Sequence, residues 1–443
     1  MGIFKAYDIR GLFGSEVTLD LAEAIGRAYA EFLKPGKIAV GRDMRSHGPE
    51  VTAALVRGLV RGGVDVLLIG EVSTPMGYFA IGHYGLDGGI QVTASHNPAV
   101  YTGFKMSREQ AIPISGDTGL EEIRRIVEGA SLPDADGPGV VSDLDIRADY
   151  TAHVLAQAGK IRPLKIAVDA ANGMGGLEVE WIFPHLAVEL VPLYLERDGN
   201  FPNHEPNPLR KENLADLIAC VLESGADLGV GFDGDGDRAC FVDELGGVVT
   251  NDLTTALLAR EVLAREKGAV VYDLRSSRVV AEVILASGGR PIRERVGHAF
   301  IKETMRRESA VFGGEFSGHY YFRENYNADS AIMAVVKVLT VLSAETRPFS
   351  EVLAPLRKYW MTGETNFEVS DKDAKVQELA AAFSDGEVDF VDGVTVQYDD
   401  WWFNVRQSNT EPLLRLNLEG MSEQAFEDGK RRVMEYLGTP VDR

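Results

Sequence analysis

The sequence predicts an α/β protein: three related α/β domains with mixed, largely parallel sheets and a smaller C-terminal α+β domain, arranged around a central cleft. Short apolar runs of strand length alternate with segments of helical periodicity, which is typical of parallel sheets with crossover helices. This alternation occurs three times in a similar order, which indicates duplication of one domain. After residue 350 the alternation stops and strand-like runs follow one another, as in an antiparallel sheet.

Each predicted unit contains strands in the same order along the chain. The expected strands lie at 37–40, 64–69 and 89–92, at 165–168, 187–194 and 228–232, and at 269–272, 291–296 and 310–312. Helices are expected between them, for example at 49–61 and 209–224. The last region is predicted to hold helices at 373–383 and 423–436 and strands at 394–398, 401–405 and 413–418. Linkers rich in Pro and Gly divide the chain into domains at 1–143, 144–246, 247–350 and 351–443.

The composition indicates a soluble globular protein, and we expect it in the cytoplasm. With 45 basic and 67 acidic residues the net charge is −22, which argues against nucleic acid and membrane surfaces as partners. Cys220 and Cys240 lie in apolar contexts, so we expect a reducing compartment and no disulfide framework. No signal peptide is recognised at the N-terminus, and the longest apolar stretch, 331–342, is too short to span a bilayer. We expect a monomer or a homodimer.

The loop that follows the predicted strand at 89–92 is the first candidate for chemistry. It reads Ser95, His96, Asn97 and Pro98. Open α/β sheets place their active sites at such strand ends, and Ser95 is a hydroxyl flanked by a titratable ring, as a group-carrying side chain requires. A plain Ser/Asn turn before proline is the alternative interpretation.

A second candidate is the acidic loop at the corresponding position of the second unit. It contains Asp233, Asp235 and Asp237 at alternate positions, separated by glycines and followed by Arg238. Carboxylate oxygens are ligands for Mg²⁺ or Ca²⁺, and three close carboxylates repel one another unless a cation binds. An EF-hand is excluded because Arg238 replaces the required glycine and a strand follows instead of a helix. A solvated acidic turn is the alternative.

Two further loops contain polar side chains suited to a phosphorylated sugar. Glu315, Ser317 and His319 follow the third unit's last strand, and residues 406–410 follow a strand of the last region. The second loop combines a guanidinium, hydroxyls and an amide, which suits a phosphate. Each loop alone could be an ordinary polar turn.

Taken together and in this order, these loops resemble the α-D-phosphohexomutases, and the chain is closest to their phosphomannomutase/phosphoglucomutase branch. The resemblance extends over the whole chain. Additional matching stretches lie at 4–11, 103–105, 201–206 and 296–298.

The resemblance implies an enzyme that interconverts hexose 1-phosphate and hexose 6-phosphate, with mannose and also glucose as the sugar. The reaction would pass through a phosphoserine enzyme and a 1,6-bisphosphate intermediate, with Mg²⁺ as cofactor and glucose 1,6-bisphosphate as activator. Ser95 would carry the phosphoryl group, and one of its oxygens would hold Mg²⁺ together with Asp233, Asp235 and Asp237. The residues implied at the reacting centre are His96, Arg10, Lys105 and His319, of which His319 or Lys105 is the candidate for taking the hydroxyl proton. The residues implied to bind substrate are Tyr7, Arg238, Arg275, His298, Glu315, Ser317, Arg406, Ser408, Asn409 and Thr410.

The chain departs from the family pattern at two positions. Bacterial bifunctional members often have lysine where this chain has Arg275, and methionine where it has Phe316. The loop that contains Glu315, Ser317 and His319, the sugar loop, also lacks the glutamine typical of the phosphoglucosamine branch. The alternatives are nevertheless a phosphoglucosamine mutase, a glucose-specific mutase, a phosphatase, or a non-catalytic protein that binds sugar phosphate or Ca²⁺.

Overall fold

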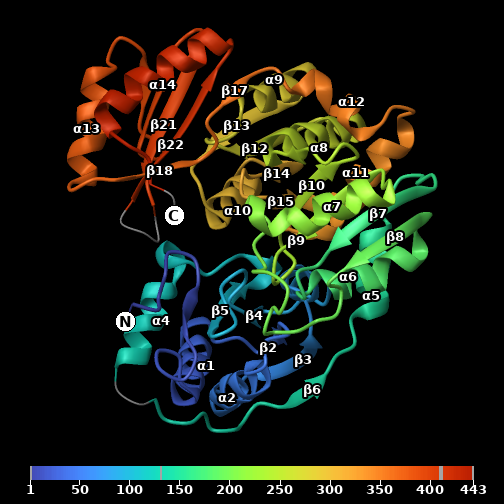
Figure 1. Cartoon of the computed structure of the whole chain (residues 1–443). Helices are drawn as coiled ribbons and strands as arrows, with labels where there is room; N and C mark the ends of the chain where they lie inside the picture. Colours follow the sequence, from blue (N-terminus) through green and yellow to red (C-terminus); the bar gives the residue numbers. More distant parts are fainter. Residues whose placement is uncertain (1, 130–131, 409–412, 442–443) are drawn as a thin grey trace.

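The computed structural model describes residues 2–129, 132–408 and 413–441 (Figure 1). The first α/β domain, drawn in blue, lies below the second and third, drawn in green to gold. The C-terminal domain, drawn in red and orange, lies beside the third domain and above the first.

The first domain contains a mixed sheet in the order β1-β5-β4-β2-β3-β6. Strands β2, β3, β4 and β6 are parallel, whereas β5 runs antiparallel to both β4 and β1. Its elements are β1 (Ile9–Leu12), α1 (Leu19–Leu33), β2 (Lys37–Arg42), α2 (Gly48–Arg61), β3 (Asp65–Glu71), α3 (Thr74–His83), β4 (Gly88–Val92), β5 (Tyr101–Arg108), α4 (Leu120–Glu128) and β6 (Val141–Asp143).

The second and third domains repeat this arrangement. The second contains α5 (Arg147–Leu155), β7 (Leu164–Asp169), α6 (Gly175–Ile182), β8 (Val188–Leu193), α7 (Ala215–Ser224), β9 (Leu228–Phe232), β10 (Ala239–Asp243) and β11 (Val248–Val249). The third contains α8 (Asn251–Arg265), β12 (Ala269–Asp273), α9 (Arg278–Ala286), β13 (Arg290–Glu294), α10 (His298–Arg307), β14 (Phe312–Gly314), β15 (Tyr320–Phe322), β16 (Ala328–Asp329), α11 (Ala331–Ala344) and α12 (Phe349–Leu353).

In all three domains the first strand of the repeated unit lies between the other two. Strand β2 lies between β3 and β4, β7 between β8 and β9, and β12 between β13 and β14, and all these pairs are parallel. A following antiparallel strand, β5, β10 or β15, pairs with the third strand. The predicted repetition of one mixed α/β domain is confirmed.

Element ends differ slightly from the prediction. The strand expected at 310–312 begins at Phe312 and continues to Gly314. The helix expected at 209–224 is divided into a 3₁₀ turn over Lys211–Leu214 and α7. Helix ends are sensitive to local capping, which periodicity does not reveal.

The C-terminal domain contains an antiparallel sheet in the order β17-β22-β21-β20-β19, with β18 also paired to β22. Its elements are β17 (Trp360–Met361), β18 (Thr365–Glu368), α13 (Lys372–Ala382), β19 (Glu387–Asp389), β20 (Val394–Gln397), β21 (Trp401–Gln407), β22 (Leu413–Gly420) and α14 (Glu423–Leu437). Phe367, Leu379, Phe403 and Val433 belong to a separate core between this sheet and its helices. The predicted α+β architecture is confirmed.

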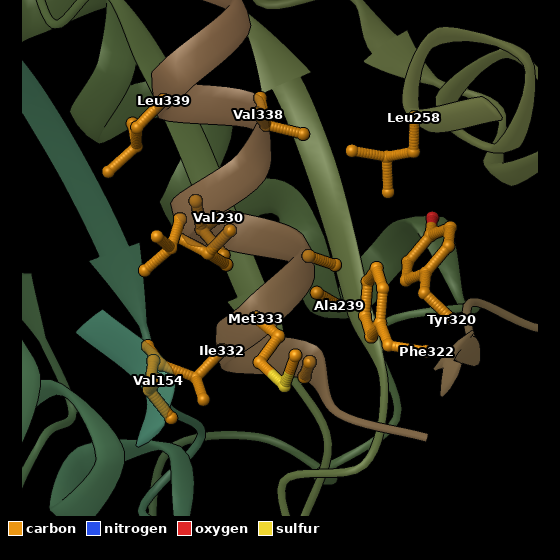
Figure 2. Close-up of a cluster of buried hydrophobic side chains, with 14 of the residues drawn as sticks. Val154, Val230, Ala239, Leu258, Tyr320, Phe322, Ile332, Met333, Val338 and Leu339 are labelled. Carbon is orange, nitrogen blue, oxygen red and sulfur yellow. The ribbon is translucent and has the colours of Figure 1, made fainter. Parts of the chain in front are cut away.

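Helix α11 is buried among the second and third domains (Figure 2). Ile332, Met333 and Leu339 belong to one apolar cluster that also includes Val230 of β9 and Phe322 of β15. Burial on nearly every side explains why the sequence of this helix is almost uniformly apolar. In the described part of the chain, no helix has both the length and the apolar character needed to cross a membrane.

In each α/β domain an aspartate ends the first strand of the unit or directly follows it. The Oδ1 atoms of Asp43, Asp169 and Asp273 accept hydrogen bonds from the backbone N–H two residues further on, at 3.1, 2.8 and 3.0 Å. This local bond is an Asx turn, which fixes the direction in which the chain leaves the strand. In the first and third domains the residue that donates this N–H is an arginine, Arg45 or Arg275.

Candidate active site

The loops that follow β4, β9 and β14 meet at the centre of the molecule. The Ser95 hydroxyl donates to Asp233 Oδ2 at 3.3 Å, which joins the first loop to the second. The backbone N–H of Ala239 donates to the Gly318 carbonyl at 3.1 Å, which joins the second loop to the third. Equivalent strand ends of three domains therefore form one site, as the sequence predicted.

Ser95 is held in a strained backbone conformation. Its φ of 51° lies in the left-handed region, which non-glycine residues seldom adopt, and strain of this kind is concentrated at functional sites. The Ser95 N–H donates to Thr93 Oγ1 at 2.9 Å, and the Ser95 hydroxyl lies 3.1 Å from His96 Nδ1. Burial and the nearby Arg238 guanidinium hold the pKa of His96 well below its usual range, so this ring is neutral at neutral pH.

Arg45 anchors the Ser95 loop, and no sequence motif indicated it. Its guanidinium donates to the backbone carbonyls of Ser95, Asn97, Pro98 and Tyr101 at 2.6–3.1 Å. Its Nε lies 3.2 Å from Asp43 Oδ2, and both side chains are 1% exposed. A buried guanidinium thus holds the backbone of Ser95 and of the residues that follow it.

The acidic loop brings three buried carboxylates together. Asp233, Asp235 and Asp237 place one oxygen each within 4.8 Å of one another. Asp233 Oδ1 accepts from the N–H groups of Asp237 and Arg238, both at 3.1 Å, which curls the loop. A Cβ on Gly234 would lie 2.5 Å from the Ser95 carbonyl oxygen, so only glycine permits this approach of the two loops.

These carboxylates fit a divalent metal ion. Among the described residues, Asp235 Oδ1 and Asp237 Oδ1 have no hydrogen-bond partner although both are buried. Burial and the charges of the neighbouring carboxylates raise the pKa of Asp233 well above its usual range. Hard oxygen donors with unused lone pairs are the ligands that Mg²⁺ prefers.

Cationic side chains surround the acidic loop. Lys105 Nζ lies 2.7 Å from Asp235 Oδ2 and 2.5 Å from Asp237 Oδ2. Arg10 donates to Asn97 Oδ1 at 2.6 Å and pairs with Asp8. These charges lie beside Ser95, where they could neutralise a phosphoryl group in transfer.

Thr74 supports the acidic loop from the first domain. Its backbone N–H donates a hydrogen bond to the Asp235 carbonyl oxygen at 3.0 Å. Its hydroxyl donates to Asp235 Oδ2 at 2.5 Å. Thr74 is the first residue of α3, and the preceding Ser73 caps that helix. The sequence showed only a polar strand end at this position.

The third loop presents Glu315 and His319. Glu315 is buried, and its carboxylate accepts from the Gly297 N–H at 3.0 Å and the Tyr321 hydroxyl at 2.5 Å. Ser317 Oγ lies 2.9 Å from His319 Nδ1. Burial alone would lower the pKa of His319, but the carboxylates of Asp237 and Glu315 outweigh it and raise this pKa to about 9. His319 therefore carries a proton at neutral pH.

Tyr7 and His298 close one side of the site. The Tyr7 hydroxyl donates to the Val296 carbonyl at 3.0 Å, which links the first domain to the third. The rings of Tyr7 and His298 meet edge to face at 5.2 Å. Gly297 has a φ of +136°, and a Cβ there would lie 2.3 Å from the Tyr7 hydroxyl. Glycine is therefore required where the two domains touch.

A second group of site residues lies where the third and C-terminal domains meet. Arg275 and Arg406 are both buried, and both pair with the carboxylate of Glu364. Oε2 of Glu364 lies 3.4 Å from Arg275 Nη1 and 2.6 Å from Arg406 Nη2. Ser408, which directly follows strand β21, is also buried. The predicted residues Asn409 and Thr410 lie outside the described residues. Glu364 was not predicted, because it follows a short strand with no recognisable motif.

Arg275 joins the two groups. It pairs with Asp273 (Nη2–Oδ2 2.5 Å), and Asp273 Oδ2 also accepts from the Phe316 N–H at 2.9 Å. The guanidinium lies over the Phe316 ring, 5.8 Å from its centroid. The two departures from the family pattern therefore contact each other. Residues of both groups line a cavity of about 720 Å³, among them Arg275, Phe316, Ser317 and Glu364.

Known protein families match the chain domain by domain. They are described as phosphoglucomutase/phosphomannomutase, alpha/beta/alpha domain I (residues 1–133), domain II (148–246), domain III (250–359) and C-terminal domain (364–435).

Similar proteins cover nearly the whole chain. A phosphomannomutase of Escherichia coli is 39% identical over 441 residues, with 96% of this chain and 97% of the relative covered. A phosphoglucomutase of Neisseria gonorrhoeae is 40% identical over 440 residues, with 96% and 94% covered. The crystal structure of a phosphoglucomutase/phosphomannomutase family protein from Burkholderia thailandensis has a TM-score of 0.90 and 37% identity, with 98% and 97% covered. With every domain matched in order, the chain belongs to the phosphoglucomutase/phosphomannomutase family.

Proposed function

We propose that this enzyme interconverts hexose 1-phosphates and hexose 6-phosphates, with mannose and glucose as the sugars, and that Ser95 carries the phosphoryl group. The observation on which this proposal rests is the contact of the Ser95 hydroxyl with Asp233, inside a ring formed by the acidic loop, Lys105 and Arg10. Phosphoryl transfer depends on positioning and charge neutralisation, and these side chains supply both. Phosphoserine would donate its group to a sugar hydroxyl, and the resulting 1,6-bisphosphate would turn and return its other phosphate to Ser95.

The acidic loop is proposed to hold Mg²⁺ through Asp233, Asp235 and Asp237, together with an oxygen on Ser95. A bound Mg²⁺ would supply positive charge to the transferring phosphoryl group. Lys105 and Arg10 would add charge from the protein itself, and the neutral His96 ring would orient the Ser95 hydroxyl. His319 or Lys105 would take the proton of the sugar hydroxyl. Because the pKa of His319 is raised to about 9 and that of Lys105 is raised, despite burial, by Asp235 and Asp237, either group would first have to give up its own proton.

Removal of divalent cations should abolish activity. We expect less than about 1% of the original rate after treatment with EDTA, since charge stabilisation of a transferring phosphoryl group contributes several kcal/mol. Added Mg²⁺ should restore the rate and also raise the melting temperature, because a ligand that binds only the folded state stabilises it. Asp235→Asn should weaken both responses to Mg²⁺. Full activity in EDTA would contradict the proposed metal role.

The remaining residues are proposed to bind the sugar phosphate. Glu315 and Ser317 would contact the ring hydroxyls, and Arg238 would contact the sugar. Tyr7, Arg275, His298, Arg406, Ser408, Asn409 and Thr410 would bind the phosphate that is not reacting. Glucose 1,6-bisphosphate is proposed as the activator that phosphorylates Ser95. We expect a monomer or homodimer acting in the cytoplasm.

Arg406→Ala should raise KM much more than it lowers the rate at saturation. We expect a rise of about 10- to 100-fold, because a hydrogen bond to a charged group contributes about 1.5–3 kcal/mol. Steady-state kinetics with glucose 1-phosphate measure this effect. Arg431, an exposed arginine of α14 paired with Asp428, provides the control, and Arg431→Ala should behave as wild type. An unchanged KM in Arg406→Ala would place the phosphate site elsewhere.

A coupled assay tests the proposed function directly. Mannose 1-phosphate, glucose 1-phosphate and glucosamine 1-phosphate are supplied in turn with Mg²⁺ and a trace of glucose 1,6-bisphosphate. Turnover of mannose and glucose phosphates supports the proposal. Turnover of the glucosamine phosphate alone would favour the phosphoglucosamine branch, and binding without turnover would favour a non-catalytic protein.

A further inference from the structure

Glu364 lies at the centre of a cluster of guanidinium groups. Its Oε2 is 2.6 Å from Arg406 Nη2 and 3.4 Å from Arg275 Nη1, and its Oε1 is 3.0 Å from Arg415 Nη1. The arginines come from the loop after β12, from β21 and from β22, whereas Glu364 precedes β18. One carboxylate is thus surrounded by cations from two domains.

The carboxylate remains charged in this environment. Burial acts to raise the pKa of Glu364, but the guanidiniums of Arg275, Arg406 and Arg415 outweigh it and lower this pKa to about 2. Asp273 already pairs with Arg275 on its other side, and the Asp392 carboxylate influences Arg406 from nearby. Glu364 is therefore a permanent anion within the cluster at any pH used for an assay.

The same guanidinium groups are those proposed to bind the distal phosphate. Carboxylate and phosphate oxygens accept hydrogen bonds from arginine in the same bidentate way. A phosphate bound to Arg275 and Arg406 would therefore share their N–H groups with Glu364 or displace it. In addition, Glu364 lines a cavity of about 720 Å³ together with Arg275, Arg415 and Ser317, so the carboxylate borders the same open space as two of these arginines.

We propose that Glu364 competes with the substrate's phosphate for the arginine cluster, an inference that rests on the proposed function of this site. The carboxylate holds the guanidiniums together before substrate binds. It then weakens phosphate binding by like-charge repulsion. The reaction requires this site to bind each phosphate of the bisphosphate in turn, so the first must leave before the second can enter. Glu364 accelerates this exchange.

The variant Glu364→Gln tests the inference, since the amide keeps the shape of the side chain and removes its charge. Inorganic phosphate is titrated into the full-length protein by calorimetry. We expect its Kd to fall about tenfold, because a repulsive charge beside the anion is gone. KM for glucose 1-phosphate should fall as well, and kcat should fall because the first phosphate of the 1,6-bisphosphate leaves the arginine cluster more slowly before the intermediate turns. If the carboxylate only orders the arginines, Glu364→Gln would show the opposite result, a higher Kd for phosphate and a higher KM.

Two further variants distinguish a failure of the Glu364 inference from a failure of the proposed phosphate site. Glu387 is an exposed glutamate of β19 in the same domain, and Glu387→Gln should leave the phosphate Kd unchanged. Arg406→Ala should lose phosphate binding. If Arg406→Ala loses phosphate binding, an unchanged or higher Kd for phosphate in Glu364→Gln overturns the inference and leaves the proposed phosphate site intact. If Arg406→Ala binds phosphate like the wild type, the phosphate site itself is wrong and the inference falls with it.

Discussion

Ser95→Ala should abolish mutase activity, with kcat reduced about 10⁴-fold or more, the scale on which enzymes lose rate when a covalent nucleophile is removed. In the proposed reaction Ser95 carries the phosphoryl group between the two ends of the sugar, so its removal interrupts the only route proposed. The fold should persist, because the side chain contributes only hydrogen bonds to Asp233 and His96. The coupled assay measures the loss of turnover.

Intact-mass measurement adds a second readout for Ser95. After incubation with glucose 1,6-bisphosphate, wild-type protein should gain the mass of one phosphoryl group, and Ser95→Ala should gain none. Ser142, an exposed serine of β6 in the first domain, provides the control, and Ser142→Ala should gain the group normally. A fully active Ser95→Ala enzyme would exclude Ser95 as the carrier.

Arg45→Met should have the largest effect on stability. Breaking one partner of a buried ion pair costs about 3–5 kcal/mol, since Asp43 would retain an uncompensated charge. Arg45 is 1% exposed, and its loss also removes four contacts to backbone carbonyls around Ser95. A small displacement of that loop can lower the rate about 100-fold. Thermal unfolding and kcat measure the two effects.

The surface pair of Arg57 and Glu23 provides a matched control for Arg45. These side chains lie 3.1 Å apart in the same domain, and Arg57 is 56% exposed. Arg57→Met should cost less than about 1 kcal/mol. In the double variant Asp43→Asn/Arg45→Met, part of the stability should return because no buried charge is left alone. Equal stability of the Arg45→Met and Arg57→Met proteins would contradict the anchoring role of Arg45.

The sequence predicted those features that are local or repeated. Strand and helix patterns predicted three copies of one domain, and each candidate loop is a compact motif at a strand end. The acidic loop could be recognised because glycines separate its carboxylates. The structure explains why one of these glycines, Gly234, is needed, since a side chain there would collide with the backbone of Ser95. Convergence of the loops followed from the repeated topology.

The supporting residues could not be predicted, because their partners are distant in the chain or lie on the backbone. Arg45 binds carbonyl groups 50 to 56 positions away, which leaves no pattern of side-chain types. Thr74 reaches Asp235 across a domain boundary. Glu364 is meaningful only beside Arg275 and Arg406, which come from different domains. The contacts of Thr74 and Glu364 depend on how the domains are placed, and those of Arg45 depend on how one domain folds back on itself, neither of which local sequence encodes.

The repeated Asx turns suggest how the copies of this domain acquired different roles. Each aspartate secures the exit from its strand through its own local backbone bond, so the next side chains were free to diverge. In the first copy Arg45 turned toward its own domain and became part of the scaffold. In the third copy Arg275 reached toward the C-terminal domain and its Glu364, and in the second Asp169 pairs with His204 instead. The same turn is thus followed by an arginine that supports its own domain in the first copy and by one that reaches the C-terminal domain in the third, whereas in the second copy the aspartate itself pairs with a histidine.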